Sequence, residues 1–359
     1  MRPTKAYVRL AAIRHNLEVT RSFAPDSNIM AVIKANAYGH GAIEVARELQ
    51  AEVPAFAVSF LDEAEQLRDA GINRPILILQ GIMGDADVAE AASKDFWLML
   101  HSRQQVDKVL HSKPAKPVRV WIKVETGMHR LGLAANALDD VCKALSACSH
   151  VQQEMTLCSH LACADEIANP VTRQQVDQLR AYAVEHDIPM SMANSAAVMA
   201  WPETHAEWNR PGYMLYGNSP FESPGVDTTA LIPAMSMTSA IMAIRDVPCG
   251  EGVGYGLDWV ASQDSRIGTI SIGYADGYPR LAANGTPVLV NGVRVPLVGR
   301  VSMDMISVDL TGLNRVAVGD PVELWGEDLS VNEVAACAGT IGYEILAGLT
   351  GRVPITYLP

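Results

Sequence analysis

The sequence lacks the features that mark membrane proteins and nucleic-acid-binding proteins. Its 359 residues contain no apolar run long enough to cross a bilayer. The stretch from Val8 to Arg14 carries charges where a secretion signal needs an unbroken apolar segment. Acidic residues outnumber basic ones by 40 to 28, giving a net charge of −12. We therefore expect neither nucleic acid nor an anionic membrane as a partner, because both attract basic patches.

Motifs for metal binding and thiol redox chemistry are also missing. None of the six cysteines stand in C-x-x-C spacing, and none of the nine histidines form a His-x-His pair. We therefore expect no metal site. The even number of cysteines would permit disulfides, but a chain of this length does not need them. We expect free thiols and a cytoplasmic protein.

Eight short apolar runs follow one another about 25 residues apart. Each except the last is followed by a segment with helical spacing of apolar residues. The runs are 29–33, 54–58, 76–79, 96–100, 118–124, 156–161, 189–193 and 207–209. Alternating strands and helices predict a parallel sheet, and eight units predict a closed (β/α)8 TIM-type barrel. We place this barrel at residues 1–230.

The pattern changes after about residue 225, where strands and tight turns replace the alternation. Asn291-Gly292 suits both positive-φ positions of a type I′ hairpin turn between 287 and 298. Ser330 and Glu333 have the spacing of a helix capping box. These signals predict a second, mainly β domain at residues 231–359, and the alternating segment 4–10 is a candidate to join it.

Lys34 is the first candidate for chemistry, because it directly follows the buried run that ends at Ile33. A lysine amine that is partly desolvated has a lowered pKa and attacks carbonyl groups. Tyr38 and the glycines after it could bind a phosphate close to a helix N-terminus. Taken alone, a lysine in this place is more often an ordinary surface residue.

Other polar residues also follow predicted barrel strands, at the rim where barrel enzymes carry out their chemistry. They are Lys123, His160, Asn194, Ser195 and Arg210. We expect them to converge with Lys34. Each has a simpler alternative: Ser195, for example, would more often be the N-cap of the helix that it begins.

The segment Ala31-Val-Ile-Lys-Ala-Asn-Ala-Tyr-Gly-His-Gly41 resembles the cofactor-lysine motif of the alanine racemases. The resemblance extends over nearly the full length, with motifs in the same order as in that family. They are Thr126–Gly132, Arg210–Tyr213, Gly254–Gly256, Gly273–Tyr278 and Gly299–Asp304. The resemblance implies a homodimeric enzyme that binds pyridoxal 5′-phosphate and interconverts L-alanine and D-alanine.

The resemblance also assigns a role to each candidate in cofactor binding. Lys34 would hold the cofactor covalently and then act as an acid–base group. Arg210 would face the pyridine nitrogen and, because a guanidinium keeps its proton, would limit side reactions such as transamination. The remaining cofactor positions would be Tyr38, His160, Asn194, Ser195, Gly212, Tyr213 and Tyr343.

Racemisation also needs a second proton-transfer group on the opposite face of the substrate. Tyr255 matches the family's second base, although the Gly-Tyr-Gly motif alone would equally fit a turn tyrosine. Arg130 matches the residue that would stabilise its phenolate and bind the substrate carboxylate. Lys123 matches a lysine that is carbamylated in many family members, and the sequence does not separate that state from a plain lysine.

The entrance to the site would use residues of both subunits. Met303 and Asp304 match entrance residues donated by the partner, and Tyr274 and Tyr343 match an inner gate. A site so closed would admit a methyl side chain and little more. The resemblance leaves open whether the enzyme supplies D-alanine for peptidoglycan or degrades alanine, and it does not exclude serine as a secondary substrate.

Three other functions fit parts of the pattern. A pyridoxal-phosphate amino-acid decarboxylase has the same architecture, but its His-x-Gly-Ser motif is missing here. A non-catalytic pyridoxal-phosphate carrier would be a barrel without a second domain. A metal hydrolase built on a modified lysine would need clustered ligands, which the histidine spacing does not provide.

Overall fold

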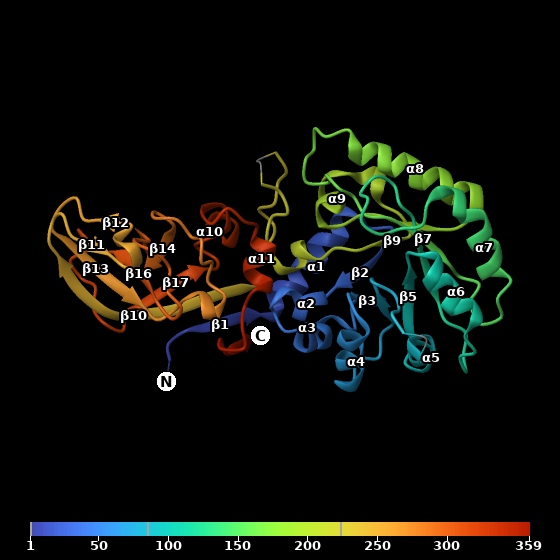
Figure 1. The fold of residues 1–359 in the computed structure, drawn as a ribbon, viewed down its shortest axis with the longest axis horizontal. Helices are drawn as coiled ribbons and strands as arrows, with labels where there is room; N and C mark the ends of the chain where they lie inside the picture. The colour runs from blue at the N-terminus through green and yellow to red at the C-terminus, as the bar shows by residue number, and fades with distance from the viewer. Residues whose placement is uncertain (1, 85, 223–224) are drawn as a thin grey trace.

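A closed parallel barrel forms one half of the molecule and a mainly β domain forms the other (Figure 1). The computed structural model describes residues 2–84, 86–222 and 225–359. Its eight barrel strands are β2 (Asn28–Val32), β3 (Ala55–Val58), β4 (Ile76–Ile78), β5 (Phe96–Leu100), β6 (Val120–Lys123), β7 (Thr156–Cys158), β8 (Met190–Ser191) and β9 (Trp208–Asn209). All eight lie at the predicted runs, so the predicted α/β barrel is confirmed.

Helices precede and connect these strands, and most of them cover the outside of the barrel. They are α1 (Leu10–Phe23), α2 (Lys34–Tyr38), α3 (Ala42–Leu49), α4 (Leu61–Asp69), α5 (Ala86–Ser93), α6 (Arg103–His111), α7 (Leu138–Ser146), α8 (Val171–His186) and α9 (Ser195–Ala200). The short α2 is an exception, because its backbone is left-handed. Every residue of β3, β4, β5 and β7 is buried. Burial on both faces explains why these strands are uniformly apolar rather than alternating.

Three tryptophans fill the interior of the barrel. The ring of Trp208 lies 5.5 Å from that of Trp97 and 5.9 Å from that of Trp121, in edge-to-face contacts. Trp97 and Trp121 also stack, with ring centroids 6.3 Å apart. Because aromatic pairs in these geometries pack well, the barrel is a solid support for the residues at its rim.

The second domain is built on an eight-stranded sheet. Its strands are β1 (Lys5–Arg9), β10 (Met235–Val247), β13 (Ser265–Ile270), β14 (Pro287–Val290), β15 (Val293–Pro296), β16 (Ile306–Asp309), β17 (Pro321–Trp325) and β18 (Ile355–Leu358). A small separate ribbon pairs β11 (Gly252–Val253) with β12 (Trp259–Val260), and two helices complete the domain, α10 (Val331–Cys337) and α11 (Gly342–Ala347).

The first strand of the chain belongs to this sheet and not to the barrel. β1 pairs with β10 in antiparallel and with β18 in parallel orientation. Ala6 and Val8 point into the core, while their neighbours are partly exposed. The candidate strand at 4–10 therefore joins the β domain, although it lies inside the range that we assigned to the barrel. The boundary near residue 230 stays our proposal.

Two local predictions in the β domain have different outcomes. Asn291 and Gly292 both have positive φ, 51° and 78°, and connect β14 to β15 as the hairpin prediction required. The capping box at α10 is only half correct. The Ser330 side chain accepts a hydrogen bond from Asn332 N, but the Glu333 carboxylate pairs with Arg294 of β15, 3.0 Å away. The Arg294 cation on a neighbouring strand therefore binds the carboxylate that the capping box would have used.

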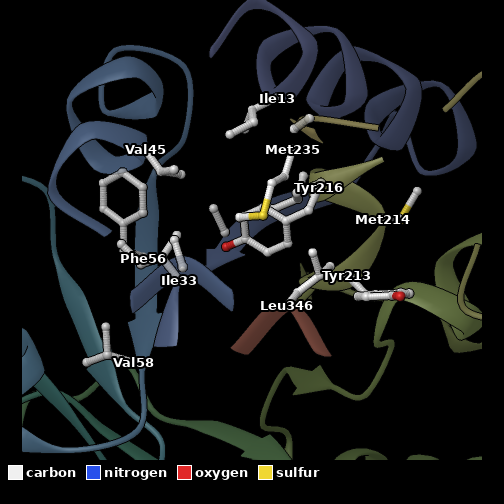
Figure 2. Close-up of a cluster of buried hydrophobic side chains, with 14 of the residues drawn as sticks. Ile13, Ile33, Val45, Phe56, Val58, Tyr213, Met214, Tyr216, Met235 and Leu346 are labelled. Atoms are coloured by element: carbon white, nitrogen blue, oxygen red, sulfur yellow. The ribbon is translucent and has the colours of Figure 1, made fainter. Parts of the chain in front are cut away.

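The barrel and the β domain share one apolar core. Figure 2 shows side chains from α1 (Ile13), from the barrel (Ile33 and Phe56) and from the β domain (Met235 and Leu346) turned toward one region. All five are almost completely buried. Burial of large side chains contributes about 1.5–3 kcal/mol each, so this core holds the two halves in a fixed arrangement.

Neither a membrane span nor a metal cluster is found in the described residues. None of the helices in residues 2–84, 86–222 and 225–359 is long and apolar enough to cross a membrane. The same residues contain no group of three His, Cys, Asp or Glu side chains placed to hold a metal ion. All six cysteines are free thiols, as expected.

Candidate active site

A cavity of about 510 Å³ opens at the carboxyl ends of the barrel strands. Eleven of the residues singled out in the sequence line it: Lys34, Tyr38, Lys123, Arg130, His160, Asn194, Ser195, Arg210, Gly212, Tyr213 and Tyr343. They come from the carboxyl end of β6, from the segments that follow β2, β6, β7, β8 and β9, and from α11 of the β domain. The expected convergence on one rim is therefore found in the structure, while the role of each residue stays a prediction.

Lys34 lies at the start of an unusual turn. Ala35, Asn36, Ala37 and Tyr38 all have left-handed backbone conformations, with φ between 51° and 54°. Such a conformation costs roughly 1–2 kcal/mol per residue, so other contacts must stabilise it. The Glu63 carboxylate accepts a hydrogen bond from Ala35 N at 2.7 Å, and Asn36 Oδ1 accepts one from Ala42 N at 2.9 Å. The turn is thus fixed at both ends, and it fixes the position of the Lys34 backbone from which the side chain extends.

His40 supports the same turn from inside the protein. Its Nδ1 lies 3.1 Å from the Ala37 carbonyl and 3.0 Å from the Tyr38 carbonyl, and its ring stacks on Tyr216 at 4.5 Å. Nε2 is buried and has no hydrogen-bond partner in the described part of the chain. Burial lowers the pKa of His40 to about 4, so the imidazole is neutral in the folded protein.

We expect His40 to make stability depend on pH. In the unfolded chain a histidine has a pKa of about 6.5, so between pH 6.5 and 4 the unfolded state binds a proton that the folded state does not. His40 alone should lower the free energy of unfolding by about 3 kcal/mol over that window, and its contribution should not grow below pH 4. Urea unfolding at a fixed protein concentration should show a smaller decline for His40→Gln, while the surface variant His111→Gln should behave as the unaltered protein. Equal declines in all three proteins would contradict this role.

Positive charge dominates the cavity. Burial lowers the pKa of Lys34, the Arg130 cation lowers it further, and Glu63 opposes the change. Burial also lowers the pKa of Lys123, together with the Arg210, Arg130 and Lys34 charges. Cations brought together at a partly desolvated rim repel one another unless anions join them. The site therefore suits a ligand that carries more than one negative group.

Arg210 is held in a fixed orientation under the cavity. It is buried, its Nη2 donates to the Ser159 carbonyl at 2.7 Å, and its Nη1 donates to the Ser191 hydroxyl. Burial lowers the pKa of the guanidinium, yet this group keeps its proton under ordinary conditions. Arg210 is therefore a rigid donor that does not act as an acid.

A cradle for an anion lies between the turn at Tyr38 and the segment after β9. A Cβ atom at Gly212 would lie 2.5 Å from the Tyr38 hydroxyl, so only glycine lets the two segments approach. Ser195 Oγ accepts hydrogen bonds from Gly212 N at 3.0 Å and Met214 N at 3.2 Å. Burial raises the pKa values of the Tyr38 and Tyr343 hydroxyls, which keeps them protonated as donors. Neutral hydroxyl donors of this kind fit a phosphate.

Ser195 is not the cap of its helix. Asn194 is the N-cap of α9, and its side chain accepts a hydrogen bond from Ala197 N at 3.0 Å. The simpler interpretation of Ser195 as an N-cap is therefore wrong by one residue. Because Asn194 takes that role, the Ser195 hydroxyl is left to bind Gly212 N and Met214 N in the cradle.

Four candidates do not line the cavity of this chain. Tyr255, Met303, Asp304 and Tyr274 all lie in the β domain. Tyr255 is 70% exposed and lies between β11 and β12, which Figure 1 places at the end of the domain far from α2. Met303 is 52% exposed, and Asp304 pairs with Arg352 at 2.7 Å. One chain alone thus provides only part of the predicted site.

The structure also adds residues that the sequence did not single out. Glu63 fixes the Lys34 turn, and Ser159 and Ser191 hold Arg210. The two serines did carry a signal, since each interrupts or ends an apolar barrel strand with a polar side chain. Leu79, Gln80 and Met99 also line the cavity, and nothing in their local sequence marks them.

An eight-stranded barrel with a lysine on a left-handed turn, joined to a β domain, defines a two-domain barrel protein with a site for a small anionic molecule. The family profile "Alanine racemase, N-terminal domain" matches residues 8–220. The profile "Alanine racemase, C-terminal domain" matches residues 234–357. The chain therefore belongs to the alanine racemase family.

Individual relatives are similar in sequence to this chain over its full length. The alanine racemase of Stutzerimonas stutzeri is 46% identical over all of both chains. The catabolic alanine racemase of Pseudomonas putida is 43% identical, over 100% of this chain and 99% of its own. The crystal structure of the biosynthetic alanine racemase from Pseudomonas aeruginosa is also 46% identical in sequence. Its match to this structure covers 100% of each chain, with a TM-score of 0.97. Since relatives of both physiological types match, similarity does not decide between them.

Proposed function

We propose that this protein interconverts L-alanine and D-alanine with pyridoxal 5′-phosphate bound at Lys34. The observation that carries the proposal is the cavity itself, where Lys34, the fixed Arg210 and the cradle of Tyr38, Ser195 and Gly212 face one space. The cradle fits a phosphate, and the excess positive charge fits both that phosphate and a substrate carboxylate. When bound, the cofactor would withdraw electrons from the substrate and acidify its Cα proton.

The residues of this chain would then divide the work. Lys34 Nζ would hold the cofactor and transfer a proton at one face of Cα, a task that its lowered pKa favours. Arg210 would face the pyridine nitrogen without protonating it. His160, whose pKa is lowered by burial and by surrounding cations, would be a neutral member of the same polar network. Asn194 and the backbone at Tyr213 would complete the cofactor site.

The opposite face of Cα would be served by a second copy of the chain. We infer a homodimer in which the partner's Tyr255 transfers the second proton, because Tyr255 is exposed and lies between β11 and β12, far from α2 of its own chain (Figure 1). Arg130, exposed at the cavity, would stabilise the phenolate and bind the substrate carboxylate. Met303, Asp304 and Tyr274 would reach the entrance from the partner and meet Tyr343 there. The six free thiols support a cytoplasmic setting.

The direct test is formation of D-alanine from L-alanine by the purified protein with pyridoxal phosphate. Chiral chromatography should show the two enantiomers approaching equal amounts, whether the reaction starts from L-alanine or from D-alanine. A decarboxylase would instead release carbon dioxide and ethylamine. A carrier would bind the cofactor and leave alanine unchanged. Either of these results would refute the proposed function.

We expect Lys123 to be carbamylated. Its amine lies among three cations, and its lowered pKa favours the neutral form that attacks carbon dioxide. The resulting anion would orient Arg130. Lys123→Ala should lower the activity by about a hundredfold, as expected when a binding group is mispositioned. Chloride should restore part of the activity by binding where the negative charge of the carbamate had been.

A crystal grown with bicarbonate should show extra density on Nζ of Lys123. A bare ammonium under those conditions would contradict carbamylation. Activity of Lys123→Ala that is the same with and without chloride would also argue against it. Lys143, a lysine on the outer helix α7, is a suitable control for alanine substitution.

A further inference from the structure

The side chain of Tyr213 forms the wall behind Tyr343. Tyr213 follows Gly212 in the segment after β9 and is 1% exposed. Its ring stacks on that of Tyr343, with centroids 3.7 Å apart and planes inclined by 12°. Tyr343 in turn lies 5.9 Å from the ring of Tyr38 and lines the cavity. Any rotation of Tyr213 would therefore remove the surface against which Tyr343 rests.

The hydroxyl of Tyr213 is anchored in the other domain. It donates a hydrogen bond to Asn332 Oδ1 of α10 at 2.6 Å. The amide nitrogen of Asn332 donates to the Ser219 carbonyl at 2.8 Å. Both ends of the Asn332 amide are thus used, and they hold the segment after β9 at two points. Burial raises the pKa of the Tyr213 hydroxyl, which keeps this donor protonated.

Gly342 leaves the space that this contact needs. A Cβ atom there would lie 2.0 Å from the Tyr213 hydroxyl and 2.3 Å from Asn332 Oδ1. Gly342 precedes Tyr343 directly and begins α11. Only glycine at this position allows the tyrosine hydroxyl to reach α10 past the start of α11. Tyr213, Asn332 and Gly342 therefore form one interlocking contact, which we call the Tyr213 lock.

We propose that the Tyr213 lock positions the ring of Tyr343, so that its hydroxyl is held ready for the phosphate of the cofactor. This inference rests on the proposed function, in which Tyr343 and Tyr38 serve the phosphate cradle. Asn332 is a positioning residue here, because it does not line the cavity and acts only through Tyr213. A donor whose orientation is already fixed loses less entropy on binding, and this favours the phosphate specifically.

Loss of the Tyr213 lock should affect pyridoxal phosphate and pyridoxal differently, because these two ligands differ only in the phosphate. Asn332→Ala and Tyr213→Phe each remove the hydrogen bond, and Tyr213→Phe keeps the ring. Each should weaken binding of pyridoxal phosphate to the cofactor-free protein by about fivefold, the usual effect of losing one hydrogen bond. Binding of pyridoxal, which lacks the phosphate, should change less than about twofold, because the lock acts on the phosphate side alone.

The two substitutions remove the same interaction, so they should not add. The double variant Asn332→Ala/Tyr213→Phe should bind pyridoxal phosphate about as well as either single variant. Asn332→Asp keeps an acceptor for the Tyr213 hydroxyl and should retain most of the phosphate preference. Tyr278→Phe is the matched control, since Tyr278 is buried in the β domain and its hydroxyl has no hydrogen-bond partner in the described residues.

The experiment is a titration of cofactor-free protein with each ligand, followed by absorbance, together with thermal unfolding of every variant. A selective loss of phosphate affinity in Asn332→Ala, with the non-additive double variant, supports the lock. Equal losses for both ligands, or losses that multiply in the double variant, would overturn it and leave Tyr213 as ordinary packing. A protein that shows the selective loss but does not racemise alanine would refute the proposed function while leaving the lock intact.

Discussion

Lys34→Ala should reduce alanine racemisation by at least about a thousandfold, the range expected when a proton-transfer group is lost. The effect should be larger than for any other single lysine, because Lys34 both holds the cofactor and acts at Cα in the proposed function. The left-handed turn fixes its position, so no neighbouring lysine replaces it. The measurement is kcat/KM for both enantiomers. Lys94→Ala is the control, since Lys94 pairs with Glu65 and Glu90 on the outer helices.

Borohydride reduction provides a readout that does not depend on turnover. In the unaltered protein it should fix the cofactor to a single peptide that contains Lys34. Lys34→Ala should yield no fixed cofactor, whereas Lys94→Ala should behave as the unaltered protein. A reduced adduct on Lys123, the other lysine that lines the cavity, would refute the assignment.

Mixed dimers of two inactive variants should regain activity. Lys34→Ala and Tyr255→Phe should each lose most activity alone. If each site combines Lys34 of one chain with Tyr255 of the other, a heterodimer has one site with both defects and one intact site. A statistical mixture contains about half heterodimers, so activity should recover to about one quarter of the unaltered protein.

Refolding the two variants together tests this arrangement directly. Native mass spectrometry must first show that heterodimers have formed. No recovery in their presence would mean that Lys34 and Tyr255 act within one chain, and the shared site would be wrong. Refolding Lys34→Ala with Lys94→Ala is the control for refolding yield, because the mixture should recover about half of the unaltered activity whether or not the site is shared.

The barrel could be predicted from the sequence because its strands are buried on both faces. Strands such as β5, with all five residues buried, produce apolar runs that stand out from the helices between them. Polar residues directly after such runs, such as Lys34 and Arg210, were therefore visible as rim residues. The hairpin at Asn291-Gly292 was predictable for a different reason, since two adjacent residues with positive φ have a strong local signature.

Contacts between distant parts of the chain could not be predicted. The hydrogen bond from Tyr213 to Asn332 joins residues separated by 119 positions, and neither residue type demands the other. The left-handed turn at Ala35–Tyr38 was also hidden, because residues other than glycine, asparagine and aspartate rarely adopt this conformation and three of the four residues here are of other types. Glu333 was assigned to the wrong partner since Arg294, which pairs with it, lies on a strand 39 positions earlier. In each case tertiary contacts decided the outcome over local preference.

The central claim is that two groups on opposite faces of Cα exchange protons with the substrate, and deuterium labelling tests it most directly. L-alanine is incubated with the protein in deuterium oxide, and the first D-alanine formed is isolated and analysed by mass spectrometry. With two separate groups, the proton that leaves and the one that arrives sit on different atoms, so early D-alanine should carry solvent deuterium at Cα while the remaining L-alanine keeps its proton. Early D-alanine that retains the substrate's own proton would show that one group serves both faces, and it would contradict the account.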